Sequence, residues 1–302
     1  MRKKKQLKYT LTLLAMSVPG VVCLVLFNYL PLIGITIAFK DYVPLKGIWG
    51  SKWVGLKNFE FFFKSQDALR VIGNTVFYSV IFLVLDLVLG VLIAVFLYNL
   101  KNGISVKIYH TVIMLPKFIS IIIVAFITYS LLSPSYGVIN QIVRFFGGDT
   151  IQWYSDPKYW PWILTIVHCW QVIGSGCLYY YAALMGIDPS LYESAELDGA
   201  SAIQKAWYIS VPSLVPIMVI TTILGIGHLF SGNMGLFYQV PKNQGLLYPT
   251  TDIINTYTYR ALLDGALEKS SAVGLFQSVV GLILVLVTNG IVRKISPEHS
   301  MF

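Results

Sequence analysis

The chain has 302 residues, of which 56% are hydrophobic and only 12% charged, with a formal net charge of +8. A soluble domain would carry about twice that charged fraction, so the composition excludes an ordinary soluble enzyme and indicates a polytopic membrane protein. The isoelectric point near 9.2 does not indicate nucleic-acid binding, because the lysines flank apolar segments and no basic face with interleaved aromatic residues is present.

The N-terminal segment predicts the first membrane span, with its continuation over about 10–39. Pro19 and Pro31 predict either kinks or a helix end near Tyr29, with an amphipathic continuation. A signal peptide is disfavoured because the apolar run is too long and no small-x-small cleavage site follows it closely. Five basic residues precede the run and predict a cytoplasmic N-terminus: Arg2, Lys3, Lys4, Lys5 and Lys8.

Five further apolar segments predict a core over about 70–292. We expect these spans at about 74–97, 109–132, 162–185, 214–230 and 273–292. Six spans from an inside N-terminus place both termini, and the polar stretch at 187–212, in the cytoplasm. Lysine and arginine are nearly balanced between the two sides, so this orientation rests on the first segment and on the number of spans.

Asp86 lies in the middle of the second predicted span. An intramembrane carboxylate is a candidate for a functional group. We favour an interhelical hydrogen bond in the protein interior, and the functional role stays open beside it. Gly90 and Ala94, two small residues four apart, predict close packing of this helix against a neighbour.

The stretch Ile187–Pro212 stands out between two apolar segments because it carries five ionisable residues: Asp188, Glu193, Glu196, Asp198 and Lys205. Each charge inside the membrane would cost about 2.5–3.5 kcal/mol, so this stretch is a polar, helical excursion out of it. Asp188 and the following proline predict a helix start. Gly199 predicts a bend between two short helices, and Pro212 predicts the first turn of the next apolar helix.

The spacing within this stretch resembles the EAA loop of binding-protein-dependent ABC importer permeases. The family pattern is Glu-Ala-Ala, a glycine four residues after the second alanine, and Ile-x-Leu-Pro ten residues beyond the glycine. Every spacing is kept here, with mild departures at Ser194 and Val211, and the triplet Asp198-Gly199-Ala200 is typical of the carbohydrate-uptake branch. The resemblance implies a cytoplasmic coupling helix that docks into an ATPase subunit through Glu193, Ser194, Ala195, Asp198, Gly199, Ile209 and Pro212.

Other segments resemble the oligosaccharide and polysaccharide permeases of the maltose-permease-like superfamily. These segments are Leu236–Val240, Leu246–Leu262, Ala272–Gly281 and the ending from Arg293 to Phe302. The resemblance implies one transmembrane domain over 1–302, with an all-α, six-span, type I ABC importer permease fold. It also implies a second homologous permease chain, an ABC ATPase dimer, an extracellular solute-binding lipoprotein, an oligosaccharide substrate and the bacterial cytoplasmic membrane.

The sequence offers no catalytic chemistry of its own. It contains no Gly-x-x-x-x-Gly-Lys-Ser/Thr loop and no Gly-x-Ser-x-Gly elbow. Its four histidines, at 110, 168, 228 and 299, show no metal-ligand spacing. We therefore expect no catalytic residue, no metal and no cofactor on this chain, and ATP and Mg²⁺ at the partner ATPase.

Two groups of residues are candidates for the substrate pathway. His168, Gln171, Val172 and Ser175 lie on one helical face, and the second group repeats that spacing: Gly225, His228, Leu229 and Gly232. Both match sugar-contacting positions of the maltose-type relatives. Polar residues in a membrane helix face the bundle interior or a wet cavity, and the alternative is that His168, Gln171 and His228 only bond one helix to another.

Alternative functions stay open at this point. The same architecture could import a monosaccharide or a sugar derivative. A secondary transporter would need internal repeats and ion-coupling charges, for which Asp86 is the one candidate. A membrane-embedded enzyme would need a clustered acidic or metal-binding motif near one interface, and none is found in the sequence. The positive charge of the outer loops is explained equally by binding of acidic sugars and by lysines that lie at the membrane interface.

Overall fold

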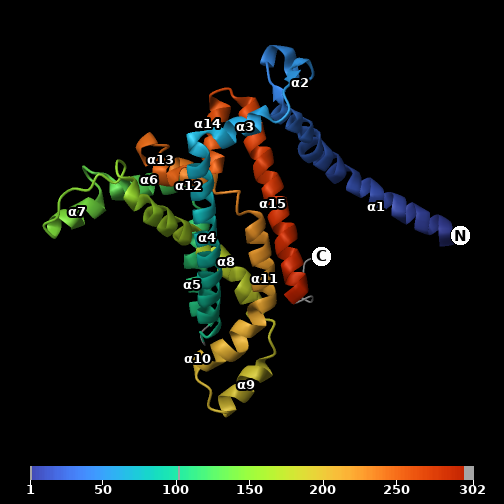
Figure 1. Cartoon of the computed structure of the whole chain (residues 1–302). Coiled ribbons are helices and arrows are strands. Elements are labelled where there is room, and N and C mark those ends of the chain that lie inside the picture. Colours follow the sequence, from blue (N-terminus) through green and yellow to red (C-terminus); the bar gives the residue numbers. More distant parts are fainter. Residues whose placement is uncertain (1, 101–102, 296–302) are drawn as a thin grey trace. The chain divides into compact units, whose positions relative to one another are not determined.

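The computed structural model describes residues 2–100 and 103–295, with side chains from Thr10 to Lys294 outside that gap. The described residues are mainly helical (Figure 1). They form two compact groups, Met1–Ser65 with Thr258–Phe276, and Gln66–Tyr257 with Gln277–Phe302. His299, the C-terminal ending over 296–302 and the side chains of the five N-terminal basic residues lie outside the described residues.

The first group contains the N-terminal span. α1 (Arg2–Leu24) passes through a π-helical segment (Val25–Tyr29) into a 3₁₀ helix (Leu30–Phe39). Pro19 lies inside α1. The helical run does not end near Tyr29, because the π-helical segment continues there into the 3₁₀ helix, and Thr10–Phe39 is one candidate span. The large apolar side chains of the described part of α1 are exposed, as expected for a helix surrounded by lipid or by another chain.

A short hairpin follows this span. β1 (Lys40–Asp41) pairs antiparallel with β2 (Lys52–Trp53), with Lys40 opposite Trp53. The buried Asn58 fastens the hairpin to the span, because its Nδ2 donates to the carbonyl oxygens of Ala38 and Lys40 at 2.9 Å each. The remaining elements around it are a 3₁₀ turn (Pro44–Lys46), α2 (Gly47–Gly50) and α3 (Lys57–Lys64). α14 (Ile254–Leu263) and α15 (Leu267–Ile295) contain residues of both groups.

Five helices within the described residues are long and apolar enough to cross a membrane. They are Thr10–Phe39; Gln66–Tyr98 (α4); Pro157–Leu184, which is a 3₁₀ turn (Pro157–Tyr159) and α8 (Trp160–Leu184); Ala202–Gly227, which is α10 (Ala202–Lys205), a π-helical segment (Ala206–Ser210) and α11 (Val211–Gly227); and Leu267–Lys294 in α15. The expected all-α membrane fold is confirmed.

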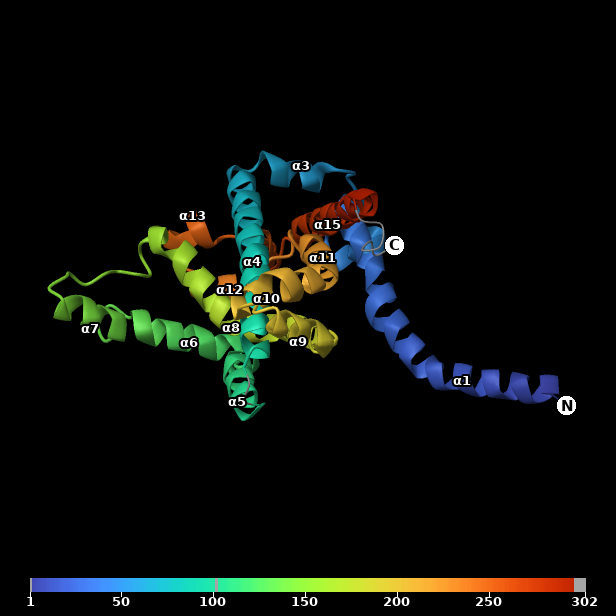
Figure 2. The same ribbon diagram turned by 90° about the horizontal axis from the view of Figure 1, so that it is seen from below.

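The predicted third span over 109–132 is wrong as a single straight helix. α5 (Gly103–Met114) runs into a 3₁₀ turn (Leu115–Phe118), and α6 (Ile121–Leu132) then leaves at an angle of 95° (Figure 2). Pro116 lacks an N–H and lies in the turn, which interrupts α-helical hydrogen bonding. Six spans are therefore reached only when this bent pair counts as one.

Polar side chains fasten the first turns of α4 to the segment that follows α12. Asn74 Nδ2 donates to the Asp252 carbonyl oxygen at 3.0 Å, and Arg70 forms a 3.1 Å ion pair with the fully buried Asp252 carboxylate. Tyr78 donates its hydroxyl to the Thr250 carbonyl oxygen at 2.7 Å. The short elements at this end of the second group are α7 (Val138–Phe145), α12 (Met234–Gln239), a 3₁₀ turn (Gly245–Leu247) and α13 (Tyr248–Thr251).

Two separate apolar clusters hold α4 against its neighbours. One contains Tyr78 and Phe82 of α4 with Trp160, and the other contains Val91, Ala94 and Leu97 of α4 with residues of α8 and α11. A Cβ on Gly90 would lie 2.9 Å from Tyr180 Cε2, so the predicted close packing around Gly90 and Ala94 is confirmed. Asp86 lies on α4 between the two clusters, where the core is interrupted.

Candidate functional site

The stretch 187–212 folds as its local signals predict. α9 (Pro189–Leu197) begins after Asp188, whose Oδ1 accepts the Ser190 N–H at 2.9 Å. This hydrogen bond holds the pKa of the Asp188 carboxyl below its ordinary value. Gly199 has a φ of +79°, which confirms the predicted bend. Ser201 and Gln204 then form a capping box at the start of α10.

Two contacts brace the bend. Lys205 forms an ion pair with Glu196 across it, and the Tyr192 hydroxyl hydrogen-bonds to Ser210 Oγ at 3.0 Å. Pro212 lies in the first turn of α11, as predicted, although the helical run already begins at Ala202. The loop is therefore a braced unit joined directly to a candidate membrane span.

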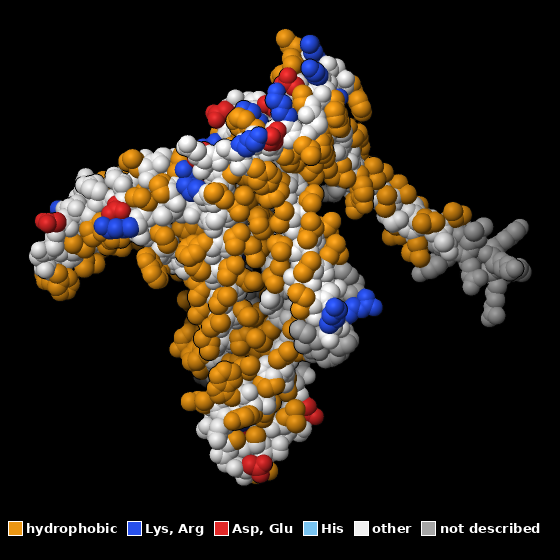
Figure 3. Space-filling model, in the orientation of Figure 1, with side chains coloured by type: hydrophobic (Ala, Val, Ile, Leu, Met, Phe, Trp, Pro, Cys, Tyr) orange, Lys and Arg blue, Asp and Glu red, His pale blue; other side chains and the backbone are white. Residues whose placement is uncertain are grey.

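The outward surface of this unit is both acidic and apolar. Figure 3 shows acidic side chains around α9, below the largely hydrophobic surface of the spans in the same compact group. Of the residues predicted to couple to an ATPase, Glu193, Ser194, Asp198, Gly199 and Pro212 are exposed, and Ala195 and Ile209 are half-buried. Large apolar side chains are exposed beside them: Leu197 at 90%, Ile203 at 74%, Trp207 at 66% and Tyr208 at 80%. Exposed apolar clusters of this kind mark surfaces that contact a protein or a membrane, and Trp207 and Tyr208 lie within the candidate span Ala202–Gly227.

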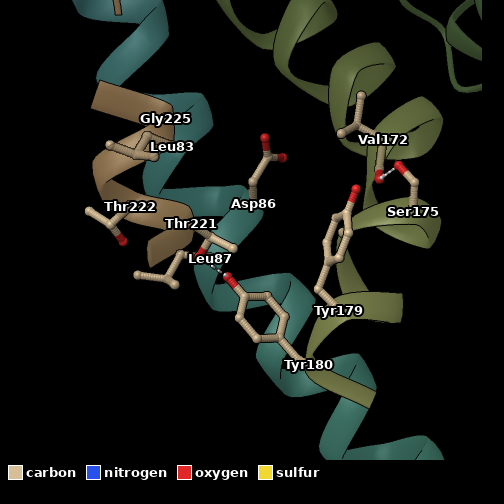
Figure 4. Close-up of a pocket in the computed structure, with 11 residues that line it drawn as sticks. Leu83, Asp86, Leu87, Val172, Ser175, Tyr179, Tyr180, Thr221, Thr222 and Gly225 are labelled. Atoms are coloured by element: carbon tan, nitrogen blue, oxygen red, sulfur yellow. Dashed lines mark hydrogen bonds between the residues drawn. The ribbon is translucent and has the colours of Figure 1, made fainter. Parts of the chain in front are cut away.

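A cavity of about 240 Å³ lies among α4, α8 and α11. Figure 4 shows Asp86 projecting from α4 into the space that Tyr179 and Ser175 of α8 also face. Tyr180 hydrogen-bonds to Thr221 of α11 at 2.9 Å, which joins α8 to α11 beside the cavity. The lining residues are Leu83, Asp86, Leu87, Val172, Ser175, Gly176, Tyr179, Tyr180, Thr221, Thr222 and Gly225.

A second cavity of about 220 Å³ adjoins the first, because Leu83, Asp86 and Gly225 line both. It also takes in His168, Phe82 and the chain that follows α11. Its lining residues are Thr75, Tyr78, Ser79, Phe82, Leu83, Asp86, His168, Gly225, His228, Leu229, Ser231, Gly232, Asn233, Phe237 and Ile253.

Asp86 and His168 form an interhelical pair between these cavities. His168 Nε2 lies 3.1 Å from Asp86 Oδ1 and 3.3 Å from Oδ2, which confirms the interhelical hydrogen bond predicted for Asp86. The imidazole stacks on Phe82 at 3.7 Å between ring centroids, and its Nδ1 is buried without a hydrogen-bond partner. His168 therefore contacts the carboxylate through one ring nitrogen only.

Most of the predicted pathway residues reach these cavities. Val172 and Ser175 line the first, His168, His228, Leu229 and Gly232 line the second, and Gly225 lines both. Gln171 lines neither cavity, and its Nε2 donates to the Ile119 carbonyl oxygen at 3.3 Å. For Gln171 the alternative of a helix-to-helix bond is thus the observed contact.

The prediction of a single helical face over 225–232 is wrong, because α11 ends at Gly227. His228 and Leu229 lie in a turn, with the His228 N–H donating to the Gly225 carbonyl oxygen at 3.1 Å. Glycine lowers helix propensity, and three glycines fall within this stretch. A Cβ at Gly225 would lie 2.3 Å from Leu83 Cδ1, so a larger residue there would require the Leu83 side chain to move.

Sequence reasoning missed the contribution of Tyr179, Thr221 and Thr222 to the site. It named Asp86 without its partner, because Asp86 and His168 are 82 positions apart and meet only when α4 packs against α8. The available signal was the presence of two rare ionisable residues in two predicted membrane spans, the second and the fourth.

Comparison with known proteins identifies the family. Residues 86–299 match the model described as "Binding-protein-dependent transport system inner membrane component". The chain belongs to this family. It is a multi-pass membrane permease subunit of a binding-protein-dependent transport system, and the predicted ABC permease identity is confirmed.

Individual relatives match this permease over nearly its whole length. It is 33% identical over 94% of its length, and 88% of the relative's, to the polygalacturonan/rhamnogalacturonan transport system permease YteP of Bacillus subtilis strain 168. It resembles a bacterial ABC transporter involved in import of the acidic polysaccharide alginate, with a TM-score of 0.88 and 32% identity over 98% of this chain and 100% of that one. A second structure shows an alginate ABC transporter in complex with alginate pentasaccharide-bound periplasmic protein, with a TM-score of 0.87 and 32% identity over 98% and 99%.

Proposed function

We propose that this permease moves oligosaccharides across the bacterial cytoplasmic membrane as one transmembrane subunit of an ATP-driven importer. The observation that carries the proposal is the match to the alginate importer chain, at 32% identity over 98% of this sequence. The name of YteP, a polygalacturonan and rhamnogalacturonan permease, supports the same substrate class.

The importer would contain a second homologous permease chain, an ABC ATPase dimer and an extracellular solute-binding lipoprotein. The alginate transporter solved with its periplasmic protein supports a partner of the last kind. This chain would bind no cofactor of its own, and ATP and Mg²⁺ would belong to the ATPase. Both termini would lie in the cytoplasm.

The unit at 187–212 would receive the movement of the ATPase. Its exposed carboxylates, Glu193 and Asp198, can accept charge-assisted hydrogen bonds, and the exposed Leu197 and Trp207 can bury apolar area in a cleft. The ion pair between Lys205 and Glu196 and the hydrogen bond between Tyr192 and Ser210 link α9 to the helical run that continues into α11. A push on α9 would then tilt α11, which carries Thr221, Thr222 and Gly225 of the cavity lining.

The test is Glu193→Lys in the complete importer, with Asp149→Lys as a matched control at an exposed acidic residue far along the chain. Loss of one charge-assisted contact is worth roughly 1.5–3 kcal/mol, so we expect glycan-stimulated ATP hydrolysis and uptake to fall about tenfold or more. The control should keep both rates. Co-purification of the ATPase with the wild-type chain is the first readout. Wild-type uptake by Glu193→Lys, or absence of an ATPase partner, would contradict the proposal.

A further inference from the structure

Asp86 lies where the two cavities adjoin. It lines both of them, and its side chain remains 34% exposed although it lies between two apolar clusters of α4. A molecule in the region where the cavities adjoin lies next to this carboxylate, together with Leu83 and Gly225. A carboxylate at this position is either covered by the His168 side chain or exposed to molecules in the cavities.

His168 holds the carboxylate without covering it. The His168 side chain is 9% exposed, is stacked on Phe82 and approaches Asp86 with one nitrogen, Nε2. An ionised carboxylate has about four acceptor sites and one N–H occupies only part of them. The remaining acceptor sites are available to hydroxyl donors in the cavity, and Figure 4 shows the Asp86 oxygens directed into that space.

The residues that line the two cavities in the described part of the chain carry one acidic side chain, that of Asp86, and no lysine or arginine. His168 and His228 are not fixed cations as those side chains are. His168 reaches Asp86 through Nε2 alone, and His228 lines the second cavity without a place in the first.

We infer that Asp86 accepts hydrogen bonds from hydroxyl groups of the transported glycan, and that this chain's share of the path takes uncharged sugar units and disfavours uronates. The inference rests on the proposed function and specifies its substrate. A uronate carboxylate beside Asp86 would meet a like charge in a partly desolvated site with no arginine or lysine to offset it. A neutral sugar offers hydroxyl donors to Asp86 and an apolar face to Tyr179 and Leu83. In this respect the chain departs from the alginate and polygalacturonan relatives.

The test uses the complete importer, purified without its binding protein so that the selectivity of that protein does not contribute. The two probes are the galacturonic acid trisaccharide and its carboxyl-reduced counterpart, galactotriose, which differ only at C6 of each unit. Binding of each is measured by saturation-transfer NMR and by calorimetry. For the wild type we expect affinity for galactotriose to exceed that for the acid by about tenfold or more, the effect of one like-charge contact.

The variant Asp86→Asn keeps the size of the side chain and removes its charge. We expect it to weaken galactotriose binding and to reduce the preference over the acid by about tenfold, since the like-charge contact is gone. The wild-type preference alone tests the inference if this variant does not assemble. A preference of the wild type for the acid, equal binding or binding of neither probe would overturn it, as would an assembled variant with unchanged affinities. An importer that retains ATPase coupling while preferring the acid would leave the proposed function intact.

Discussion

The bend between α9 and α10 depends on one left-handed residue. Gly199 has a φ of +79°, and its N–H donates to the Glu196 carbonyl oxygen at 3.0 Å while the Ala200 N–H donates to Ala195 at 2.9 Å. A Cβ at position 199 would meet no heavy atom within 4 Å. An alanine at this position therefore tests the backbone conformation without a steric clash of its Cβ.

The free-energy cost of substituting Gly199 follows from its left-handed backbone conformation. A left-handed residue with a Cβ costs roughly 1–2 kcal/mol, asparagine costs less, and a β-branched residue costs more. We expect Gly199→Ala to open the bend about 5 to 30 times more often. Gly199→Asn should be milder and Gly199→Val more severe. The order should be the same in glycan-stimulated ATP hydrolysis, because α9 would be misplaced in the open state.

Hydrogen exchange of the Ala200 amide in the reconstituted importer measures the opening, and ATP hydrolysis measures its consequence. Gly186→Ala is the matched control, since Gly186 has no positive φ and its Cβ would make an ordinary 3.4 Å contact with the Ala183 carbonyl oxygen. Equal exchange in Gly199→Val and the wild type would refute the conformational reasoning. Faster exchange with unchanged ATP hydrolysis would refute the coupling role alone.

Three further outcomes are expected. Asn140→Ala removes a fully buried amide that accepts two N–H groups and should destabilise the loop after α7, since each unsatisfied donor costs about 1–3 kcal/mol; unchanged amide exchange there would contradict this. Gly90→Leu should cost about 1–3 kcal/mol by overpacking against Tyr180, seen as a lower melting temperature, which an unchanged value would exclude. The pKa of Asp188 is lower in the folded loop than in the unfolded chain. The stability that this carboxylate adds is therefore complete above the unfolded pKa of about 3.9, and it is lost as pH falls through the lower folded pKa. The NMR chemical shift of the Ser190 amide should follow that titration in the wild type and should show no such pH dependence in Asp188→Asn.

The local features of the loop at 187–212 could be read from its residues. A helix cap, a proline in a first turn and a glycine at a bend act over a few positions. The local structure at Asp188, Gly199 and Pro212 can therefore be predicted from the nearby sequence. The break at Pro116 was also present in the sequence. Its angle was not, because neighbouring contacts decide whether a proline kinks a membrane helix or ends it.

By itself, the sequence determined the membrane class, the positions of most spans and the family, because hydropathy and motif spacing are properties of short stretches of chain. Only the tertiary structure paired Asp86 with His168 and divided the predicted pathway residues between two cavities, while leaving Gln171 outside them. The physical reason is that these relations depend on how α4, α8 and α11 pack. Packing is set by many weak contacts, such as that of Gly90 with Tyr180, between residues far apart in the chain.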